Sequence, residues 1–409
     1  MAVGVRDEVG YIEPIEGLRG VAVLWVVAFH YVVVRTAGFP ADPWLQLVAA
    51  SPAAQVIVRN GYLGVDLFFL ITGFLLTLPW LRHAERQLPA PPAREFYRRR
   101  AHRILPAYYV QLLFLFLICI PLLRDLTYWK TDLAYYLLNF AAHVTMVHYT
   151  TPLTSSSVAI NGALWTLALE AQYYLLLPLL APLVVRAPRV TAAALLAAAV
   201  AWRWLAQYDM TPLVDFQMAL SFIWSLPESK IRHLLGTQLP AYLGHFAAGI
   251  LAGRAWLRWR EHRPGRFESA AWLGAAAACL FVLYRMHAPG GVWLGDFNWI
   301  LIPISMGILM LALVSSGVAA ARPLLANAPL KFAGRISYSI YLYHLPLLLL
   351  WNKFAPRELG WLSLPLYLVL VTAAGWASYT WVEVPYLRRM SAPARARPDC
   401  ERGDDRERL

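Results

Sequence analysis

The chain has 409 residues, of which 59% are hydrophobic and only 15% are charged. A water-soluble domain of this length cannot bury so much apolar surface in one core, so the composition excludes an ordinary soluble protein and indicates one solvated by a lipid bilayer. The net charge of +12 does not indicate a nucleic-acid partner, because the arginines follow the predicted membrane topology and do not form one basic surface.

Long apolar runs recur along the chain and predict an all-α integral membrane protein, a polytopic bundle of about ten transmembrane helices. A helix needs about 18 or more apolar residues to cross roughly 30 Å of hydrocarbon. Spanning β-strands would give short alternating segments, and none recur here. The predicted spans are 18–37, 61–81, 104–123, 163–185, 190–207, 238–256, 269–286, 299–318, 332–351 and 362–383.

The arginines set the expected orientation of this bundle. Most of them fall in segments predicted to face the cytoplasm, above all 82–103 and 388–409. Positively charged segments stay inside, so both termini of this multi-pass cell-membrane protein are expected in the cytoplasm. We expect an integral membrane domain over 1–387 and a basic, disordered cytoplasmic tail over 388–409. The first apolar run lacks a small-residue cleavage site and predicts an uncleaved first helix.

Four ionisable residues are predicted at one depth, in the outer half of the bilayer. Counting 1.5 Å per residue along each predicted helix brings His30, Asp66, Glu170 and His344 to the same layer. Ionisable side chains are costly in hydrocarbon, so this coincidence predicts a functional site. Structural roles stay open for each of the four, because a histidine can bridge two helices and a carboxylate can belong to a structural ion pair.

A cationic site is predicted nearer the cytoplasm. Arg19 precedes His30 by eleven residues, so the two side chains share a helix face roughly 16 Å apart. Arg99, Arg100 and Arg103 lie just before the third span, and arginine forks match the oxygens of phosphate groups. These three arginines are alternatively a simple topological anchor on the inner side.

The same residues lie in segments that resemble the membrane acyltransferase type 3 family, and the match covers most of the chain. Segment 16–20 with His30 is similar to the family's arginine–histidine signature. Thr72 and Thr166 stand where the family usually has serine, and Ala171 stands where a second glutamate is frequent, so a paired-carboxylate role is not expected there. Each segment alone is weakly specific, whereas six in order are strongly specific. The other matching segments are 64–74, 99–106, 164–174, 337–344 and 383–385.

This resemblance implies an O-acyltransferase that moves an acyl group from cytoplasmic acyl-CoA to a hydroxyl of a carbohydrate-type acceptor, extracytoplasmic or membrane-associated. Acetyl-CoA is the expected donor, and no metal is expected. The resemblance does not specify the acceptor, which could be a polysaccharide, peptidoglycan or a glycoside. A soluble hydrolase-like extension found in some members is not expected within these 409 residues. The donor's phosphates would be held by Arg19, Arg99, Arg100 and Arg103.

His30 is the expected general base, because an imidazole that titrates near neutral pH suits proton transfer from an acceptor hydroxyl. Asp66 or Glu170 would orient its ring and stabilise the imidazolium that forms. A covalent acyl-histidine intermediate is the alternative mechanism. Three further residues are expected at the site: Trp165, Tyr341 and His344.

Two other functions stay open at this point. A proton-coupled exporter or flippase would use the same ionisable layer and predicts flux without a covalent product, but it leaves the arginine-rich loop without a role. A lipid-linked glycosyltransferase would need an acidic site outside, and Asp209 with Asp215 forms no recognised signature.

Overall fold

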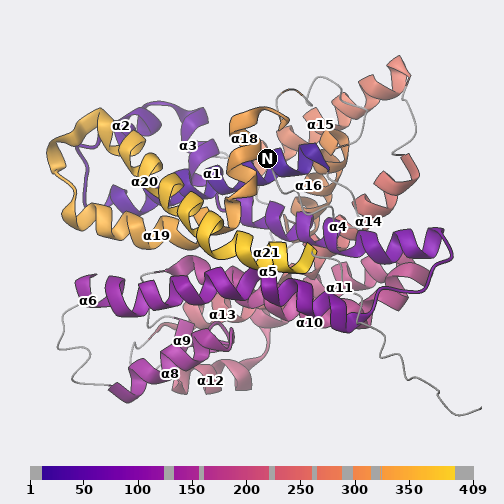
Figure 1. Cartoon of the computed structure of the whole chain (residues 1–409), viewed down its shortest axis with the longest axis horizontal. Coiled ribbons are helices and arrows are strands. Elements are labelled where there is room, and N and C mark those ends of the chain that lie inside the picture. The colour runs from indigo at the N-terminus through magenta and orange to yellow at the C-terminus, as the bar shows by residue number, and fades with distance from the viewer. Residues whose placement is uncertain are drawn as a thin grey trace, which may run out of the picture.

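The computed structural model describes residues 12–123, 133–155, 161–220, 226–259, 265–287, 298–314, 323 and 325–391. Every regular element in these residues is a helix, which confirms the all-α class (Figure 1). The predicted tail lies outside the described residues beyond position 391, and its first four residues belong to the helix α21 (Val384–Ser391).

The N-terminal half forms long helices joined by short ones. The long helices lie where apolar runs predicted spans, and the short ones lie in the connections between them. In chain order the elements are α1 (Glu13–Thr36), α2 (Pro43–Ala50), α3 (Pro52–Arg59), α4 (Leu63–Glu85), α5 (Ala93–Phe114), η1 (Leu115–Cys119), α6 (Ile120–Leu123), α8 (Leu133–Val144), α9 (Pro152–Ser155), η2 (Gly162–Leu164), α10 (Trp165–Arg186) and α11 (Pro188–Tyr208).

The C-terminal half continues the bundle and returns to α1, against which both α18 and α19 pack. Its last long helix turns into a π-helical segment, η6, before α21. The elements are α12 (Thr211–Ala219), α13 (Glu228–Gly236), α14 (Leu239–Trp259), α15 (Arg266–His287), α16 (Asn298–Val314), α18 (Ala328–Arg335), α19 (Ser337–Phe354), η5 (Arg357–Leu362), α20 (Ser363–Ser378) and η6 (Tyr379–Glu383).

Each predicted span coincides with a helix in the described part of the chain. Seven helical stretches there are long and apolar enough to cross a membrane, and they correspond to seven of the predicted spans. The other three predicted spans correspond to α14, α16 and α19, which do not meet the same criteria of length and apolarity. A total of about ten spans and cytoplasmic termini therefore remain predictions.

One predicted span has the wrong start. The segment expected to run as one helix from residue 332 is broken at Ile336, whose backbone (φ −95°, ψ 10°) separates α18 from α19. Lys331 and Arg335 of α18 form ion pairs with Glu13 and Glu16 of α1. Because these charged side chains bind the start of α1, α18 packs beside it as a short helix and does not extend the apolar one.

The backbones of α4 and α14 pack closely against each other. A Cβ atom on Gly73 would lie 2.5 Å from the carbonyl oxygen of Phe246, and one on Gly249 would lie 2.2 Å from that of Leu70. Only glycine permits backbones to approach this closely, and small residues serve the same purpose in other membrane helix pairs. The closely packed α4–α14 pair lies beside the site described below, and α4 contributes residues to it.

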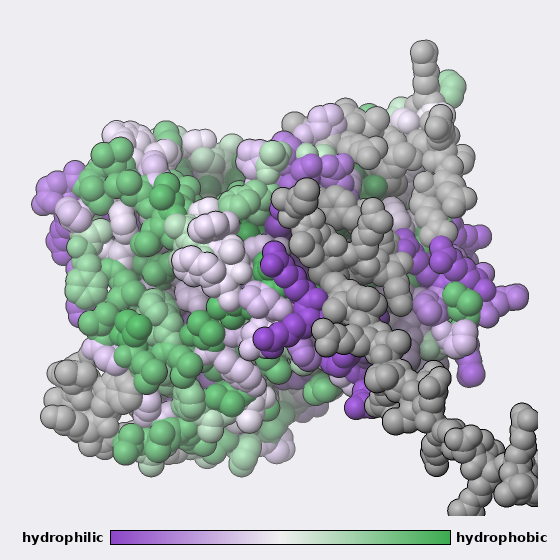
Figure 2. Space-filling view, in the orientation of Figure 1, coloured by the Kyte–Doolittle hydropathy of each residue, from purple (hydrophilic) through white to green (hydrophobic). Residues whose placement is uncertain are grey.

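The outer surface has the polarity that a bilayer requires. Figure 2 shows hydrophobic residues over the centre and left of the molecule, with hydrophilic residues concentrated at the right, where α4 meets α5. Large apolar side chains such as Leu179 and Val190 are 72% and 70% exposed. Such a surface is unfavourable in water and favourable against lipid.

Candidate active site

The best-formed cavity within the described residues lies between α1, α4, α5, α10, α19 and η6 and has a volume of about 830 Å³. This is within the usual range for small-molecule and cofactor sites. Its lining includes exposed Pro92 near the α4–α5 connection and extends inward to Phe68 and Tyr341. The cavity therefore joins the hydrophilic end of the molecule to its interior.

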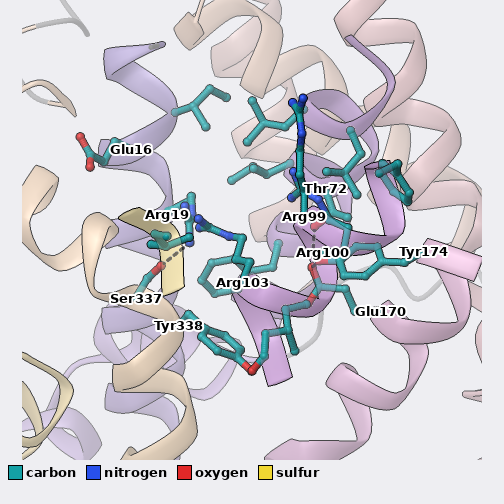
Figure 3. A pocket seen from close by; sticks show the side chains of 18 of the residues that line it. Glu16, Arg19, Thr72, Arg99, Arg100, Arg103, Glu170, Tyr174, Ser337 and Tyr338 are labelled. Carbon is teal, nitrogen blue, oxygen red and sulfur yellow. Dashed lines mark hydrogen bonds between the residues drawn. The ribbon is translucent and has the colours of Figure 1, made fainter. Parts of the chain in front are cut away.

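All four of the predicted phosphate-binding arginines line this cavity: Arg19 from α1, and Arg99, Arg100 and Arg103 from α5. Figure 3 shows their side chains converging from the two helices on a common space. Residues three and four apart share a helix face, which brings Arg99 and Arg100 onto the side of α5 that Arg103 occupies. Four guanidinium groups in one cavity make it suited to an anion with several phosphates.

Close backbone packing fixes the position of Arg19. A Cβ atom on Gly17 would lie 1.9 Å from the carbonyl oxygen of Leu325, and one on Gly334 would lie 1.8 Å from that of Glu16. These glycines let α1 lie directly against α18 and the segment just before it, so the adjoining start of α19 comes within reach. The Arg19 Nη2 atom donates a hydrogen bond of 3.0 Å to Ser337 Oγ, the first residue of α19.

Glu170 faces the arginines across the cavity. Its Oε1 atom accepts a hydrogen bond of 3.2 Å from Thr72 Oγ1 of α4 and another from the hydroxyl of Tyr174 on its own helix (Figure 3). Thr72 thus supplies the hydroxyl that the family usually provides with serine. These contacts do not include His30, so they give no support to the interpretation that Glu170 orients that ring.

His30 and His344, predicted at the same depth, are brought together by α1 and α19. Their rings lie 4.9 Å apart between centroids, with His344 Nε2 3.2 Å from His30 Nδ1. The ring of His344 also lies 5.5 Å from that of Tyr341, which lines the cavity. His344 is fully buried, whereas His30 is partly exposed. The histidine pair therefore lies directly behind the inner wall of the arginine cavity.

Asp66 lies apart from this pair, and its contacts give no support to the expectation that it orients His30. Its Oδ1 atom is 2.8 Å from Nε2 of His245 on α14, and both side chains are buried. Asp66 follows Gly64, whose closest neighbours are on α1, by two residues, so its side chain leaves α4 in a different direction. The four ionisable residues of the predicted layer are thus divided among three separate sets of contacts.

Tyr341 and Trp165, the remaining predicted site residues, occupy different places. The hydroxyl of Tyr341 lies 2.8 Å from Thr166 Oγ1 and donates to the carbonyl oxygen of Ala163 at 3.0 Å, which holds the ring at the cavity wall. Trp165 instead packs its ring 5.5 Å from that of Tyr242. Trp165 does not line the cavity and belongs to an aromatic cluster on the side of α14.

Two buried partners were not predicted as site residues from the sequence, although segment 383–385 was among those that resemble the family. His245 lies in the middle of a predicted span. The signal that could have revealed it was Asp66, because a carboxylate predicted within the membrane needs a partner. Glu383 ends the π-helical segment η6, with its Oε1 atom 2.5 Å from Ser339 Oγ of α19. π-Helical turns frequently mark functional sites, and η6 also places Tyr379 and Thr380 in the cavity wall. A local π-helical turn has no clear sequence signal.

Comparison with known proteins gives a match over nearly the whole chain. A family model described as "Acyltransferase domain" (Acyl_transf_3) matches residues 12–380. The peptidoglycan O-acetyltransferase OatA of Listeria monocytogenes is 25% identical over 354 residues, which are 83% of this chain and 50% of that protein. No solved structure matches the chain.

Two further relatives extend this picture. The O-acetyltransferase OatA of Staphylococcus aureus is 24% identical over 406 residues, 93% of this chain and 58% of that protein. A protein of Komagataeibacter xylinus that bears the name of a membrane-bound transacylase, BcsY, is 26% identical over 404 residues, 94% of this chain and 86% of its own. The chain thus spans between half and three fifths of the length of the OatA relatives.

Proposed function

The chain belongs to the acyltransferase family whose model spans residues 12–380, as the resemblance predicted, and on this basis we propose that it transfers an acetyl group from acetyl-CoA to a hydroxyl group of a cell-envelope glycan. It is a multi-pass bacterial membrane protein. Two of its relatives bear names that specify O-acetyl transfer, one of them to peptidoglycan, which makes peptidoglycan the first acceptor to test.

The observation that carries this proposal is one cavity with two chemically different ends. Its lining holds the four arginines together with Tyr341, whose ring contacts the ring of His344. Acyl-CoA has the same polarity: several phosphates at one end and a reactive thioester at the other. Arginine forms strong, charge-assisted hydrogen bonds with phosphate, so the arginines would hold the phosphate end.

Part of the cavity wall is apolar, which suits the uncharged arm of the donor. Leu75 and Leu76 of α4 and Leu167 of α10 line it, with Phe68 near the inner end. An arm extended along this wall would direct the thioester toward Tyr341 and the histidine pair. Holding both reactants in one orientation is itself a large contribution to rate.

In the proposed transfer, the acceptor's hydroxyl oxygen bonds to the thioester carbonyl carbon while His30 takes the hydroxyl proton. The carbon–sulfur bond then breaks, and the leaving thiolate recovers that proton from His30. The products are the O-acyl ester and the free CoA thiol, and the imidazole is neutral again. In the alternative route, His30 first forms an acyl-imidazole and releases the thiol, and the acceptor hydroxyl then displaces the imidazole.

The neighbours of the two predicted carboxylates change their proposed roles. Glu170, held by Thr72 and Tyr174, would shape the cavity and balance the charge of the arginines. Asp66, paired with His245, would fasten α4 to α14 and not take part in proton transfer. The exporter and flippase alternative does not account for membership in an acyltransferase family, and we do not propose it.

The proposal is tested by deleting the gene and measuring alkali-labile acetate on purified peptidoglycan and on other surface glycans by mass spectrometry. The wild-type gene should restore an acetyl increment on one glycan, and His30→Gln should not. His233→Gln, a change at an exposed histidine of α13, should restore it fully and serves as the matched control. Identical acetate content on every glycan in the deletion and wild-type strains would refute acetyl transfer to the envelope.

A further inference from the structure

The contacts of the two histidines determine which ring nitrogens carry protons. His344 Nδ1 lies 2.7 Å from the carbonyl oxygen of Tyr341, which can only accept a hydrogen bond. His344 Nδ1 is therefore the protonated nitrogen. In the opposite tautomer, the lone pairs of that nitrogen and of the carbonyl oxygen would face each other at this short distance.

The tautomer of His344 fixes that of His30. With its proton on Nδ1, neutral His344 presents a lone pair on Nε2, and this atom lies 3.2 Å from His30 Nδ1. The same His30 nitrogen lies 3.0 Å from the carbonyl oxygen of Val26, a second group that only accepts. Because both neighbours are acceptors, His30 Nδ1 must carry the proton, and the unprotonated nitrogen of His30 is Nε2.

The backbone around His344 is held by contacts that keep this arrangement in place. The carbonyl oxygen of His344 accepts a hydrogen bond of 2.8 Å from the hydroxyl of Tyr367 on α20. Two residues further along, Pro346 has no N–H to offer Leu342 in the preceding helical turn. Asn161 Nδ2 instead donates a hydrogen bond of 3.0 Å to the carbonyl oxygen of Leu342. This carbonyl group therefore has a partner in the helical turn that positions the His344 ring.

We propose that His344 is the positioning residue of the transfer reaction: it holds His30 as the Nδ1–H tautomer, so that Nε2 is the atom that accepts the hydroxyl proton. This inference rests on the proposed function, because it needs His30 to act as base or nucleophile. When Nε2 takes the proton, the charged ring still donates from Nδ1 to the lone pair of His344, which stabilises the imidazolium.

His344 thus has the role that a buried carboxylate has in a Ser-His-Asp triad, but it is uncharged. An uncharged partner suits a site surrounded by hydrocarbon, because a buried carboxylate is expensive unless it is fully paired. In this chain the nearby carboxylate, Asp66, is paired with His245 instead. The histidine pair therefore needs no buried charge until the proton is transferred.

Two near-isosteric variants separate the two hydrogen bonds of His344. In His344→Gln the amide oxygen falls near the position of Nε2 and still accepts from His30. In His344→Asn the amide falls near the position of Nδ1, so it still donates to Tyr341 but does not reach His30. We expect His344→Asn to lower kcat roughly 10–100-fold with an unchanged KM for acetyl-CoA, the loss typical of removing an orienting partner, and His344→Gln to keep most of kcat.

Equal loss in the two variants at wild-type thermal stability would overturn the assignment, as would a loss confined to KM. A loss of folding in His344→Asn is recognised by its elution in detergent size-exclusion chromatography, and the decision then rests on the spectroscopic measurement of the wild-type protein.

That measurement is ¹⁵N NMR of the histidine-labelled protein, which distinguishes the two neutral tautomers without reference to activity. The signals of the pair are identified by their absence in His30→Gln and in His344→Gln. The Nδ1–H form is expected for both residues of the wild-type protein. An Nε2–H form of His30 would overturn the proposal even if acetyl transfer is established, whereas an inactive protein with the expected tautomers would refute the proposed function alone.

Discussion

Two contacts that involve histidine, His245 with Asp66 and His30 with His344, join helices in the described part of the chain, and they differ in burial and in the partner of the histidine. His245 is 1% exposed and its Nε2 atom lies against the carboxylate of Asp66, between helices whose backbones almost touch. His30 is partly exposed and makes both of its hydrogen-bond contacts through Nδ1, one of them to the ring of His344, behind the wall of an arginine-lined cavity. The predicted depth in the membrane is similar for the two sites, so the cavity is what singles out the His30–His344 pair as the proposed site of acyl transfer and leaves the Asp66–His245 pair as a proposed structural link between helices.

The largest effect is expected from His30→Gln, which removes the proposed base. General bases contribute roughly 10²–10⁴-fold to rate, so kcat for acetyl transfer should fall by about that factor. Thermal stability in detergent should change little, because His30 is only partly buried. The measurement is the initial rate of acetyl transfer by purified protein. Retention of more than about a tenth of the wild-type kcat would remove the difference drawn between the two pairs.

The opposite result is expected at the other pair. Removing one member of a buried pair leaves the other uncompensated and costs about 3–5 kcal/mol. His245→Leu should therefore lower the thermal unfolding temperature sharply, while any folded protein keeps its kcat. The double variant Asp66→Leu with His245→Leu should recover much of the lost stability. If Asp66→Leu abolished transfer in a protein of unchanged stability, the pair would be catalytic and the comparison would fail.

A smaller effect is expected from Arg103→Gln in the cavity. Each hydrogen bond to a charged group contributes about 1.5–3 kcal/mol, so the KM for acetyl-CoA should rise roughly 10- to 100-fold. Arg98→Gln is the control on the same helix, because Arg98 bonds to Glu95 and does not line the cavity. Kinetics with varied acetyl-CoA measure both, and an equal rise in the two variants would indicate a general effect of charge.

The smallest effect is expected at Thr72, whose hydroxyl donates to Glu170. Thr72→Ser keeps the hydroxyl and should leave kcat/KM unchanged. Thr72→Val removes one hydrogen bond, worth about 0.5–1.5 kcal/mol, so kcat/KM should fall by less than about tenfold. Parallel assays of the two variants test this, and a defect in Thr72→Ser as large as in Thr72→Val would show that size, and not the hydroxyl, matters.

Much of the fold could be predicted from the sequence, because apolar runs and the charged residues between them directly indicate membrane helices. Every predicted span has a helix, and the error at Ile336 arose where charged residues of α18 bind α1. The four arginines were predictable as a group because three share a face of one helix, and Arg19 lies roughly three turns before His30 on one face of another.

The contacts between helices could not be predicted from the sequence in this way. Counting residues gives the depth of Asp66 and the face it occupies on its own helix, but not which neighbour that face meets. That choice depends on glycines such as Gly73 and Gly249, which bring α14 against α4 and so bring His245 to Asp66. Depth alone therefore grouped Asp66 with His30, whereas packing separates them.

The most direct test of the central claim is equilibrium binding of acetyl-CoA to purified protein, measured by calorimetry for wild type, His30→Gln and Arg103→Gln. If the cavity holds the donor and the histidine pair performs the transfer, His30→Gln binds with the wild-type Kd despite its much lower kcat, and Arg103→Gln binds more weakly. Wild-type affinity in Arg103→Gln, or an equal loss of affinity in both variants, would contradict the claim.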